Sequence, residues 1–246
     1  HFIKSVLKHS SIVCAANEYE KQIFSDLYSE ANVEIIRNGI NLKSLISKKN
    51  FKEKYKIKSN FVLFVGRFSK SKGIDVLIEA INIIKNDLTK LNTRLVIMGV
   101  DFGYQNEMIE TIDKLALSEH IIIIKNPPRE DVISSYGESQ FLILPSVWEL
   151  SPLVPLESFA FKKPVISTNS HGIPFTVQHN KTGILVEPDN PNELADAIKK
   201  LLNEPDLIEK LGLEGYNFVK NECNCISMAT NILKLYEKAL ENNEIK

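Results

Sequence analysis

Two glutamates, Glu149 and Glu157, lie where a predicted strand gives way to a predicted helix. Residues 141–144 form an apolar run closed by a proline, which is typical of a strand buried on both faces of a sheet. Residues 155–161 are typical of a helix that carries proline in its first turn. Ligands of open parallel sheets bind at such seams, the junctions between the carboxyl end of a strand and the amino end of the next helix. Free helix N–H groups at these junctions favour anionic oxygens.

Two carboxylates at this seam suit a ligand that presents hydroxyls beside a phosphate, as a sugar nucleotide does. One carboxylate can accept both hydroxyls of a ribose while the other holds the transferred sugar. The alternative is that Glu157 only complements the helix dipole and that Glu149 is a solvated loop acid.

The loop of residues 66–73 is a second candidate for ligand binding. Gly66 allows a tight turn, and Arg67 and Lys72 project from the same strand-to-helix loop. An arginine fork and a lysine point charge offset two phosphate charges without a metal ion, so the loop suits a diphosphate. The spacing matches neither the dinucleotide fingerprint nor the Walker loop, which argues against a Rossmann dehydrogenase and a P-loop ATPase. A solvated turn is the alternative.

A third candidate loop, residues 169–174, also follows an apolar run. Gly172 is expected to allow close approach of the backbone to a ligand. His171 can hydrogen-bond a phosphate or a hydroxyl, and the alternative is a surface histidine without a role.

Six apolar runs define the elements that must position these loops. The runs alternate with amphipathic segments, which predicts an α/β fold with a doubly wound, parallel six-stranded sheet and carboxy-terminal helices. The helix predicted over residues 74–86 carries its apolar residues on one face, and the last helix is predicted over about residues 224–240. The predicted strands cover residues 61–65, 95–98, 121–124, 141–144, 165–167 and 184–186.

The amino-terminal residues have a different pattern. Asn17 and Glu20 have capping-box spacing, which predicts a helix between two short strands over residues 11–16 and 33–36. Asn38 and Gly39 predict a turn. The Lys-rich stretch that follows indicates a linker with a short helix around residues 51–55. The predicted divisions of the chain are residues 1–40, 41–58 and 59–246.

Composition limits the class of protein. The 246 residues are 43% hydrophobic and 25% charged, which is typical of a soluble globular chain that buries a core. A net charge of -1 gives no electrostatic reason to expect nucleic acid as a partner. The three cysteines lack metal-ligand spacing, so we expect reduced thiols in a cytoplasmic protein. No apolar run reaches the length that crosses a bilayer.

The motifs on consecutive seams resemble those of the family 4 retaining glycosyltransferases, in the nucleotide-sugar-binding, carboxy-terminal Rossmann-like half of their GT-B fold. Glu149 and Glu157 match the family's Glu-x7-Glu signature. Residues 66–73 match its Gly-Arg-x4-Lys-Gly loop, and residues 38–41 resemble its Asn-Gly-Val-Asp interdomain segment. The resemblance runs from residue 37 to the end, whereas residues 1–36 resemble only the last strand and helix of the family's amino-terminal domain.

This resemblance implies a metal-independent, retaining hexosyltransferase without a cofactor. It implies that a nucleotide diphosphate-sugar is the donor and that a glycan, lipid or small molecule is the acceptor. Arg67 and Lys72 would hold the diphosphate, Glu149 the sugar and Glu157 the ribose, with Glu149, Arg67 and Lys72 as the catalytic residues. The implied donor-binding residues are Gly66, Arg67, Lys72, Glu149, Ser151, Leu153, Glu157 and His171.

The chain departs from the family's pattern beside the implied sugar site. Leu150, Ser151 and Pro152 stand where the family usually has Gly-Phe-Gly, which removes flexible glycines and one backbone donor. Phe175 replaces an acid and His171 a glycine. These changes bear on the identity of the sugar more than on diphosphate binding.

We expect the chain to be part of a longer enzyme, because residues 1–36 match only a remnant of an acceptor domain. Alone it would transfer no sugar, and its last helix would expose part of its apolar stripe or bury it in a neighbouring molecule. Two other functions stay open: a catalytically silent nucleotide-sugar-binding module, and a GT-B epimerase, which needs acid and base residues that are not evident. Peripheral membrane association of the full-length protein also stays open.

Overall fold

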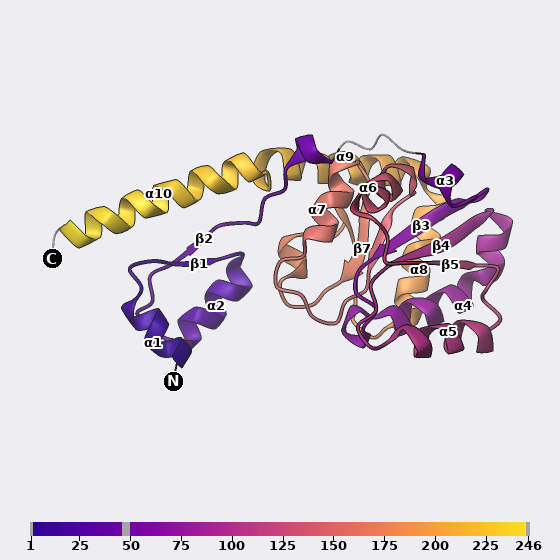
Figure 1. Ribbon diagram of the computed structural model, residues 1–246, viewed down its shortest axis with the longest axis horizontal. Helices are drawn as coiled ribbons and strands as arrows, with labels where there is room; N and C mark the ends of the chain where they lie inside the picture. The colour runs from indigo at the N-terminus through magenta and orange to yellow at the C-terminus, as the bar shows by residue number, and fades with distance from the viewer. Residues whose placement is uncertain (1, 46–49, 245–246) are drawn as a thin grey trace.

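A parallel six-stranded sheet forms the centre of the larger part of the chain, as predicted (Figure 1). The computed structural model describes residues 2–45 and 50–244. The strands of the sheet are β3 (Asn60–Val65), β4 (Thr93–Gly99), β5 (Ile121–Lys125), β6 (Leu142–Leu144), β7 (Val165–Thr168) and β8 (Gly183–Val186). Their spatial order is β5-β4-β3-β6-β7-β8, so the direction of winding reverses between β3 and β6. In open α/β sheets the loops diverge at such a reversal and leave a crevice at the carboxyl ends of the strands.

Helices cover both faces of this sheet (Figure 1). Short 3-10 helices lie in the described connections: η1 (Leu42–Ser44), η2 (Lys70–Lys72) and η3 (Ile173–Phe175). The α-helices that follow β2 are α3 (Phe51–Lys54), α4 (Ile74–Lys90), α5 (Gln105–Lys114), α6 (Arg129–Glu138), α7 (Leu153–Ala160), α8 (Pro191–Asn203), α9 (Pro205–Glu222) and α10 (Cys225–Glu244). No helix within the described part of the chain is both long and apolar enough to cross a membrane.

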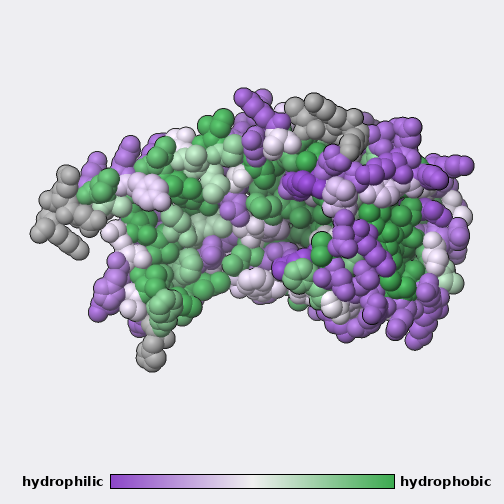
Figure 2. Space-filling view, in the orientation of Figure 1, coloured by the Kyte–Doolittle hydropathy of each residue, from purple (hydrophilic) through white to green (hydrophobic). Residues whose placement is uncertain are grey.

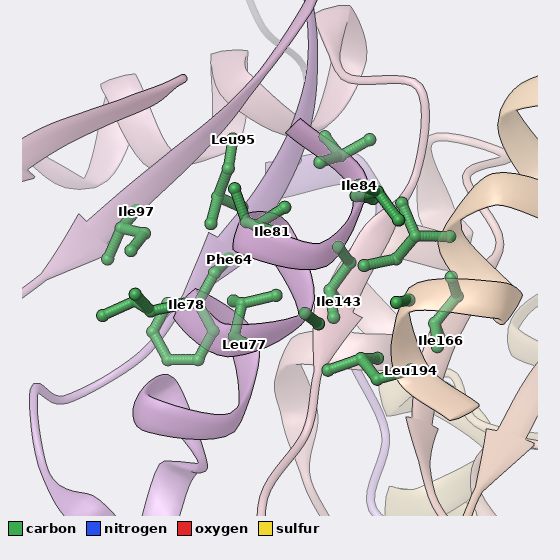
Figure 3. Close-up of a cluster of buried hydrophobic side chains, with 14 of the residues drawn as sticks. Phe64, Leu77, Ile78, Ile81, Ile84, Leu95, Ile97, Ile143, Ile166 and Leu194 are labelled. Atoms are coloured by element: carbon green, nitrogen blue, oxygen red, sulfur yellow. The ribbon is translucent and has the colours of Figure 1, made fainter. Parts of the chain in front are cut away.

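Side chains of β3 alternate between two apolar clusters, one on each face of the sheet. Val62 and Phe64 pack with α4, α5 and α8, and Figure 3 shows Phe64 next to Leu77 and Ile78 of α4. Phe61, Leu63 and Val65 pack instead with α6 and α7. This follows from the two-residue period of a strand, and it explains why β3 is an unbroken apolar run.

Helix α4 anchors the first of these clusters. Leu77, Ile78, Ile81 and Ile84 are all fully buried, as their helical spacing predicts (Figure 3). The helix continues to Lys90, four residues beyond the predicted end at residue 86, because Leu88 is also buried and extends the apolar stripe.

Residues 2–35 form a small separate unit. It consists of α1 (Phe2–His9), β1 (Val13–Ala15), α2 (Glu18–Leu27) and β2 (Val33–Ile35), with β1 and β2 paired in parallel. Asn17 caps α2 as predicted, since its side chain accepts a hydrogen bond of 3.0 Å from the Glu20 backbone N–H. Helix α1 has no counterpart in the sequence prediction. Helix α10 extends from the larger part toward this unit, and Leu233, Tyr236 and Leu240 on it are exposed, in agreement with the expected apolar stripe (Figure 1).

The prediction of a turn at Asn38 and Gly39 is wrong. The chain runs straight through Gly39, and the Ile40 N–H donates to the Cys223 carbonyl at 2.9 Å, between α9 and α10. A Cβ atom on Gly39 would lie 2.5 Å from the Asn224 carbonyl oxygen. Glycine is therefore required here for close backbone packing.

The predicted divisions at residues 40 and 58 remain predictions. Helices η1 and α3 fall within the predicted linker, and α3 agrees with the short helix expected around residues 51–55. Residues 46–49 of that linker lie outside the described residues.

Candidate functional site

The carboxyl ends of β3 and β6 bring Lys72 and Glu149 together. Gly73 immediately precedes α4 and has a φ of +64°, and a Cβ atom there would lie 2.0 Å from the Pro145 carbonyl oxygen. Only glycine fits this position, which holds the loop after β3 against the loop after β6. The Val147 N–H also donates to the Ser71 carbonyl at 3.0 Å.

Lys72 and Glu149 form an ion pair at this edge of the sheet. The Lys72 ammonium donates to Oε1 of Glu149, and the Ser146 hydroxyl donates to the same oxygen at 3.3 Å. The two charged side chains are only 12% and 18% exposed. The pair places one cation and one carboxylate where an anionic ligand with hydroxyls can meet both.

Arg67 lies in the same loop but is exposed to solvent. Its guanidinium packs over the ring of Phe102, 4.8 Å from the ring centre, and forms no ion pair with any residue within 2–45 or 50–244. Phe102 follows β4 in a turn that Asp101 fixes by accepting three backbone hydrogen bonds at the start of α5. The stacked guanidinium therefore keeps its donors available for an anion.

Glu157 belongs to a second polar group, with two residues that the sequence analysis did not identify. Arg129 donates to both carboxylate oxygens, and the bond from Nη1 to Oε2 is 3.0 Å long. The Tyr136 hydroxyl, whose ring is fully buried, donates to Oε2 at 2.9 Å. Burial, then the charge and hydrogen bond of Glu157, raise the pKa of Tyr136 well above its usual value, so the hydroxyl remains a donor.

These three bonds occupy most of the acceptor capacity of Glu157. A carboxylate has about four lone-pair sites, so one direct bond to a ligand hydroxyl remains while Arg129 stays in place. Arg129 follows β5, at the same edge of the sheet as the other candidate loops. The signal in the sequence is its position: Arg129 lies at the end of the first loop after the predicted strand 121–124, and that loop is at the same edge of the sheet as the other three.

His171 lies against aromatic residues from two other segments. Its ring centre is 5.4 Å from that of Tyr19 on α2 and 6.0 Å from that of Trp148. Nδ1 of His171 lies 2.5 Å from the hydroxyl oxygen of Ser170. His171 also has a φ of +51°, a left-handed conformation in which glycine is more common.

The role expected for Gly172 needs correction. Its φ is -85°, and its close approach is to the Leu150 carbonyl, because a Cβ atom would lie 1.7 Å from that oxygen. The Gly172 N–H donates to the Glu149 carbonyl at 3.0 Å. Gly172 therefore joins the loop after β7 to the loop that carries Glu149.

The amino-terminal unit and the segment that follows it support this same loop. The Asn17 and Asn38 amides donate to the carbonyls of Leu150 and Ser151, at 2.6 Å and 3.2 Å. Leu153 is 47% exposed and begins α7, two residues before the predicted helix start at residue 155. Ser151 and Leu153 thus follow Glu149 in the same loop and at the start of α7, and neither forms a hydrogen bond to Lys72 among the described residues.

The predicted site residues therefore fall into three groups at one edge of the sheet. Lys72 and Glu149 are in direct contact, His171 joins them through the backbone of Gly172, and Arg67 and Glu157 lie in separate clusters. Among residues 2–45 and 50–244 no group of three His, Cys, Asp or Glu side chains is placed to hold a metal ion.

Known proteins share both this sequence pattern and this fold. The family described as Glycosyl transferases group 1 matches residues 46–218. A glycosyltransferase of Methanocaldococcus jannaschii is 29% identical over 246 residues, covering 97% of this chain and 62% of that protein. The chain thus spans less than two thirds of that relative.

Solved structures extend the comparison. A glycosyltransferase from Rickettsia africae superposes with a TM-score of 0.88 at 27% identity, over 98% of this chain and 67% of that one. HepE from Anabaena, solved in complex with UDP-glucose, gives a TM-score of 0.85 at 18% identity, over 96% of this chain and 66% of that one, and shows the fold alone. With its GT-B-type parallel sheet and its matching sequence, the chain belongs to the group 1 glycosyl transferases.

Proposed function

We propose that this chain binds the nucleotide diphosphate-sugar donor of a retaining hexosyltransferase. The observation that carries the proposal is the Lys72–Glu149 ion pair at the point where the sheet reverses its winding. This pair, with Arg67 in the same loop as Lys72, supplies cations for a diphosphate and a carboxylate for a sugar hydroxyl. UDP-glucose is a suitable first ligand, because the similarly folded HepE was solved with it.

Each side chain has a defined task in this proposal. Arg67 and Lys72 stabilise the negative charge that develops on the diphosphate as its bond to the anomeric carbon breaks. Glu149 orients the sugar, and Glu157 accepts a ribose hydroxyl through its remaining acceptor site. Because Glu149 is already paired with Lys72, the departing diphosphate takes the proton of the acceptor hydroxyl. Retention of configuration rests on the resemblance of Glu149 and Glu157 to the family 4 signature.

The two glutamates should be distinguishable by ligand. Glu157→Ala is expected to weaken the binding of both UDP and UDP-glucose by roughly tenfold to a hundredfold, because both carry the ribose and a bond to a charged group is worth about 1.5–3 kcal/mol. Glu149→Ala is expected to weaken UDP-glucose more than UDP, because only the former carries the sugar. Calorimetric titration of each variant with each ligand measures this. Glu79→Ala, at an exposed position of α4, is the matched control and should bind like the wild type. Equal losses for the two ligands in Glu149→Ala would contradict its assignment to the sugar.

Binding of UDP should also be independent of divalent metal. Lys72 and Arg67 supply the positive charge that Mg²⁺ provides at sites where carboxylates chelate it. Titration of UDP in excess chelator is expected to give the same affinity as titration with Mg²⁺ or Mn²⁺. A loss of affinity in chelator that either ion restores would contradict the proposed cationic diphosphate site.

Sugar transfer itself requires an assay on the full-length protein. Acceptor-dependent release of UDP from UDP-sugars, with analysis of the product's anomeric configuration, is expected to show retention. Tight binding of UDP-glucose without any such turnover would favour the catalytically silent module.

A further inference from the structure

Trp148, His171 and Tyr19 form an aromatic cluster in which only His171 belongs to the implied donor-binding residues, and the proposed function gives none of the three a task. The three residues come from the loop after β6, the loop after β7 and helix α2. Trp148 is the single tryptophan of the chain and is 50% exposed. It meets His171 edge-on, with an angle of 60° between the rings. A tryptophan that served only packing would be buried, whereas this one leaves much of its surface open to solvent.

The hydrogen bonds around His171 fix which ring nitrogen can accept a proton. The Ser170 hydroxyl donates its only hydrogen to the Val147 carbonyl, at 2.7 Å. In its contact with Nδ1 of His171 the same hydroxyl must therefore accept, so the neutral imidazole carries its hydrogen on Nδ1. Nε2 is then a hydrogen-bond acceptor, and it has no partner among residues 2–45 and 50–244.

An open indole beside an imidazole acceptor and a carboxylate is suited to a sugar ring. The C–H groups on one face of a pyranose pack on an aromatic surface, while its hydroxyls need acceptors at the edge. We infer that Trp148 and His171, flanked by Tyr19, form a subsite for a pyranose ring of the acceptor. This inference rests on the proposed function, since it takes Glu149 to hold the donor's sugar.

The position of the cluster favours the acceptor over the donor. Lys72 reaches Glu149 from the loop after β3, whereas the cluster adjoins α2 of the amino-terminal unit. A cavity of about 810 Å³ opens on that side, and its lining includes Leu150, Ser151 and Glu20. Figure 2 shows hydrophobic residues gathered over this part of the surface, along α10 and the amino-terminal unit. The aromatic cluster therefore adjoins the amino-terminal unit, whereas the donor's diphosphate is assigned to Lys72 in the loop after β3.

The single tryptophan makes the test direct. The chain is saturated with UDP and titrated with the methyl glycosides of glucose, galactose, mannose and N-acetylglucosamine, while acrylamide quenching of Trp148 fluorescence is followed. At least one glycoside is expected to protect Trp148 from the quencher. If none protects it up to the limit of solubility, the subsite is refuted.

The affinity of site variants for the protecting glycoside, measured by calorimetry or saturation-transfer NMR, shows which side chains bind it. Trp148→Ala is expected to lower the affinity for this glycoside about tenfold or more, and His171→Ala is expected to lower it severalfold. Trp148→Phe should lower it much less, because an aromatic face remains. His171→Asn tolerates the left-handed backbone and separates loss of the ring from loss of the fold. Ile83→Ala, equally exposed at 50% but remote on α4, should bind like the wild type. Unchanged affinity in Trp148→Ala would overturn the inference.

A parallel titration with UDP-glucose shows whether a sugar at Trp148 belongs to the donor or to the acceptor. It also shows which of the two proposals is wrong if one of them fails. If UDP-glucose protects Trp148 and the glycosides do not, the pyranose in this subsite is the donor's and the acceptor assignment is wrong. If neither UDP nor UDP-glucose binds, the proposed function fails, whereas protection by a glycoside alone would still show a sugar subsite at Trp148.

Discussion

Replacing Lys72 with alanine is expected to lower the affinity for UDP by about tenfold to a hundredfold, since a hydrogen bond to a charged group is worth about 1.5–3 kcal/mol. The structure adds a second effect. Lys72 and Glu149 are only 12% and 18% exposed, so the variant leaves a mostly buried carboxylate without its cation. We therefore expect a lower thermal midpoint as well as weaker binding. Calorimetric titration with UDP and a thermal unfolding curve measure the two effects.

Lys70→Ala is the matched control for this prediction. Lys70 lies in the same short 3-10 helix and has the same charge, but it is 65% exposed and pairs with Glu107 on α5 at 2.8 Å. An exposed ion pair contributes little, so the variant should retain nearly wild-type affinity and stability. If Lys70→Ala and Lys72→Ala lower the affinity for UDP equally, the loop acts through its net charge, and the specific role proposed for Lys72 is wrong.

Gly172→Ala is expected to destabilise the chain by about 3 kcal/mol, the upper end of the usual cost of overpacking. The new methyl group would lie 1.7 Å from the Leu150 oxygen and 2.6 Å from its carbonyl carbon, and backbone atoms cannot rotate away as a side chain does. The loops that carry Glu149 and His171 must then separate, which breaks the bond from the Gly172 N–H to the Glu149 carbonyl. For a chain of this size the thermal midpoint should fall by roughly 6–12 °C, and binding of UDP-glucose should weaken.

Gly137→Ala is the control that shows whether the loss of stability is specific to position 172 or follows from any glycine-to-alanine substitution. Gly137 lies in α6, and a methyl group there would be 3.6 Å from the ring of Phe161, an ordinary contact. Alanine is a better helix former than glycine, so stability should be unchanged or higher by up to about 1 kcal/mol. A Gly172→Ala variant as stable as Gly137→Ala would show that the two loops are not packed as described.

Helix α9 shows how tertiary packing overrides local propensity. No element is assigned to residues 205–222 from the sequence, and Gly212 and Gly215 each cost a helix about 1 kcal/mol relative to alanine. In the structure both glycines face close neighbours. A Cβ atom would lie 2.0 Å from the Lys162 carbonyl oxygen at Gly212 and 2.4 Å from the Phe159 ring at Gly215. The residues that weaken the helix locally are those that let α9 pack against α7.

The sequence by itself determined the sheet and the edge at which the candidate site lies. Strands buried on both faces are apolar runs, and α4 repeats its apolar residues at helical spacing, so both patterns are local and readable without contacts. The placement of Glu149 and Lys72 after two such runs also follows from local sequence, because parallel strands end at one edge of the sheet.

Only the tertiary structure decided which side chains meet at that edge. Lys72 and Glu149 are 77 residues apart, Arg129 and Glu157 are 28 apart, and Asn17 contacts the carbonyl of Leu150 across 133 residues. Such pairs depend on strand order and on backbone contacts as close as that of Gly73 with Pro145, neither of which has a local signal. The same reason explains the turn wrongly predicted at Gly39: glycine permits both a turn and a close approach, and only the neighbouring backbone of Asn224 decides between them.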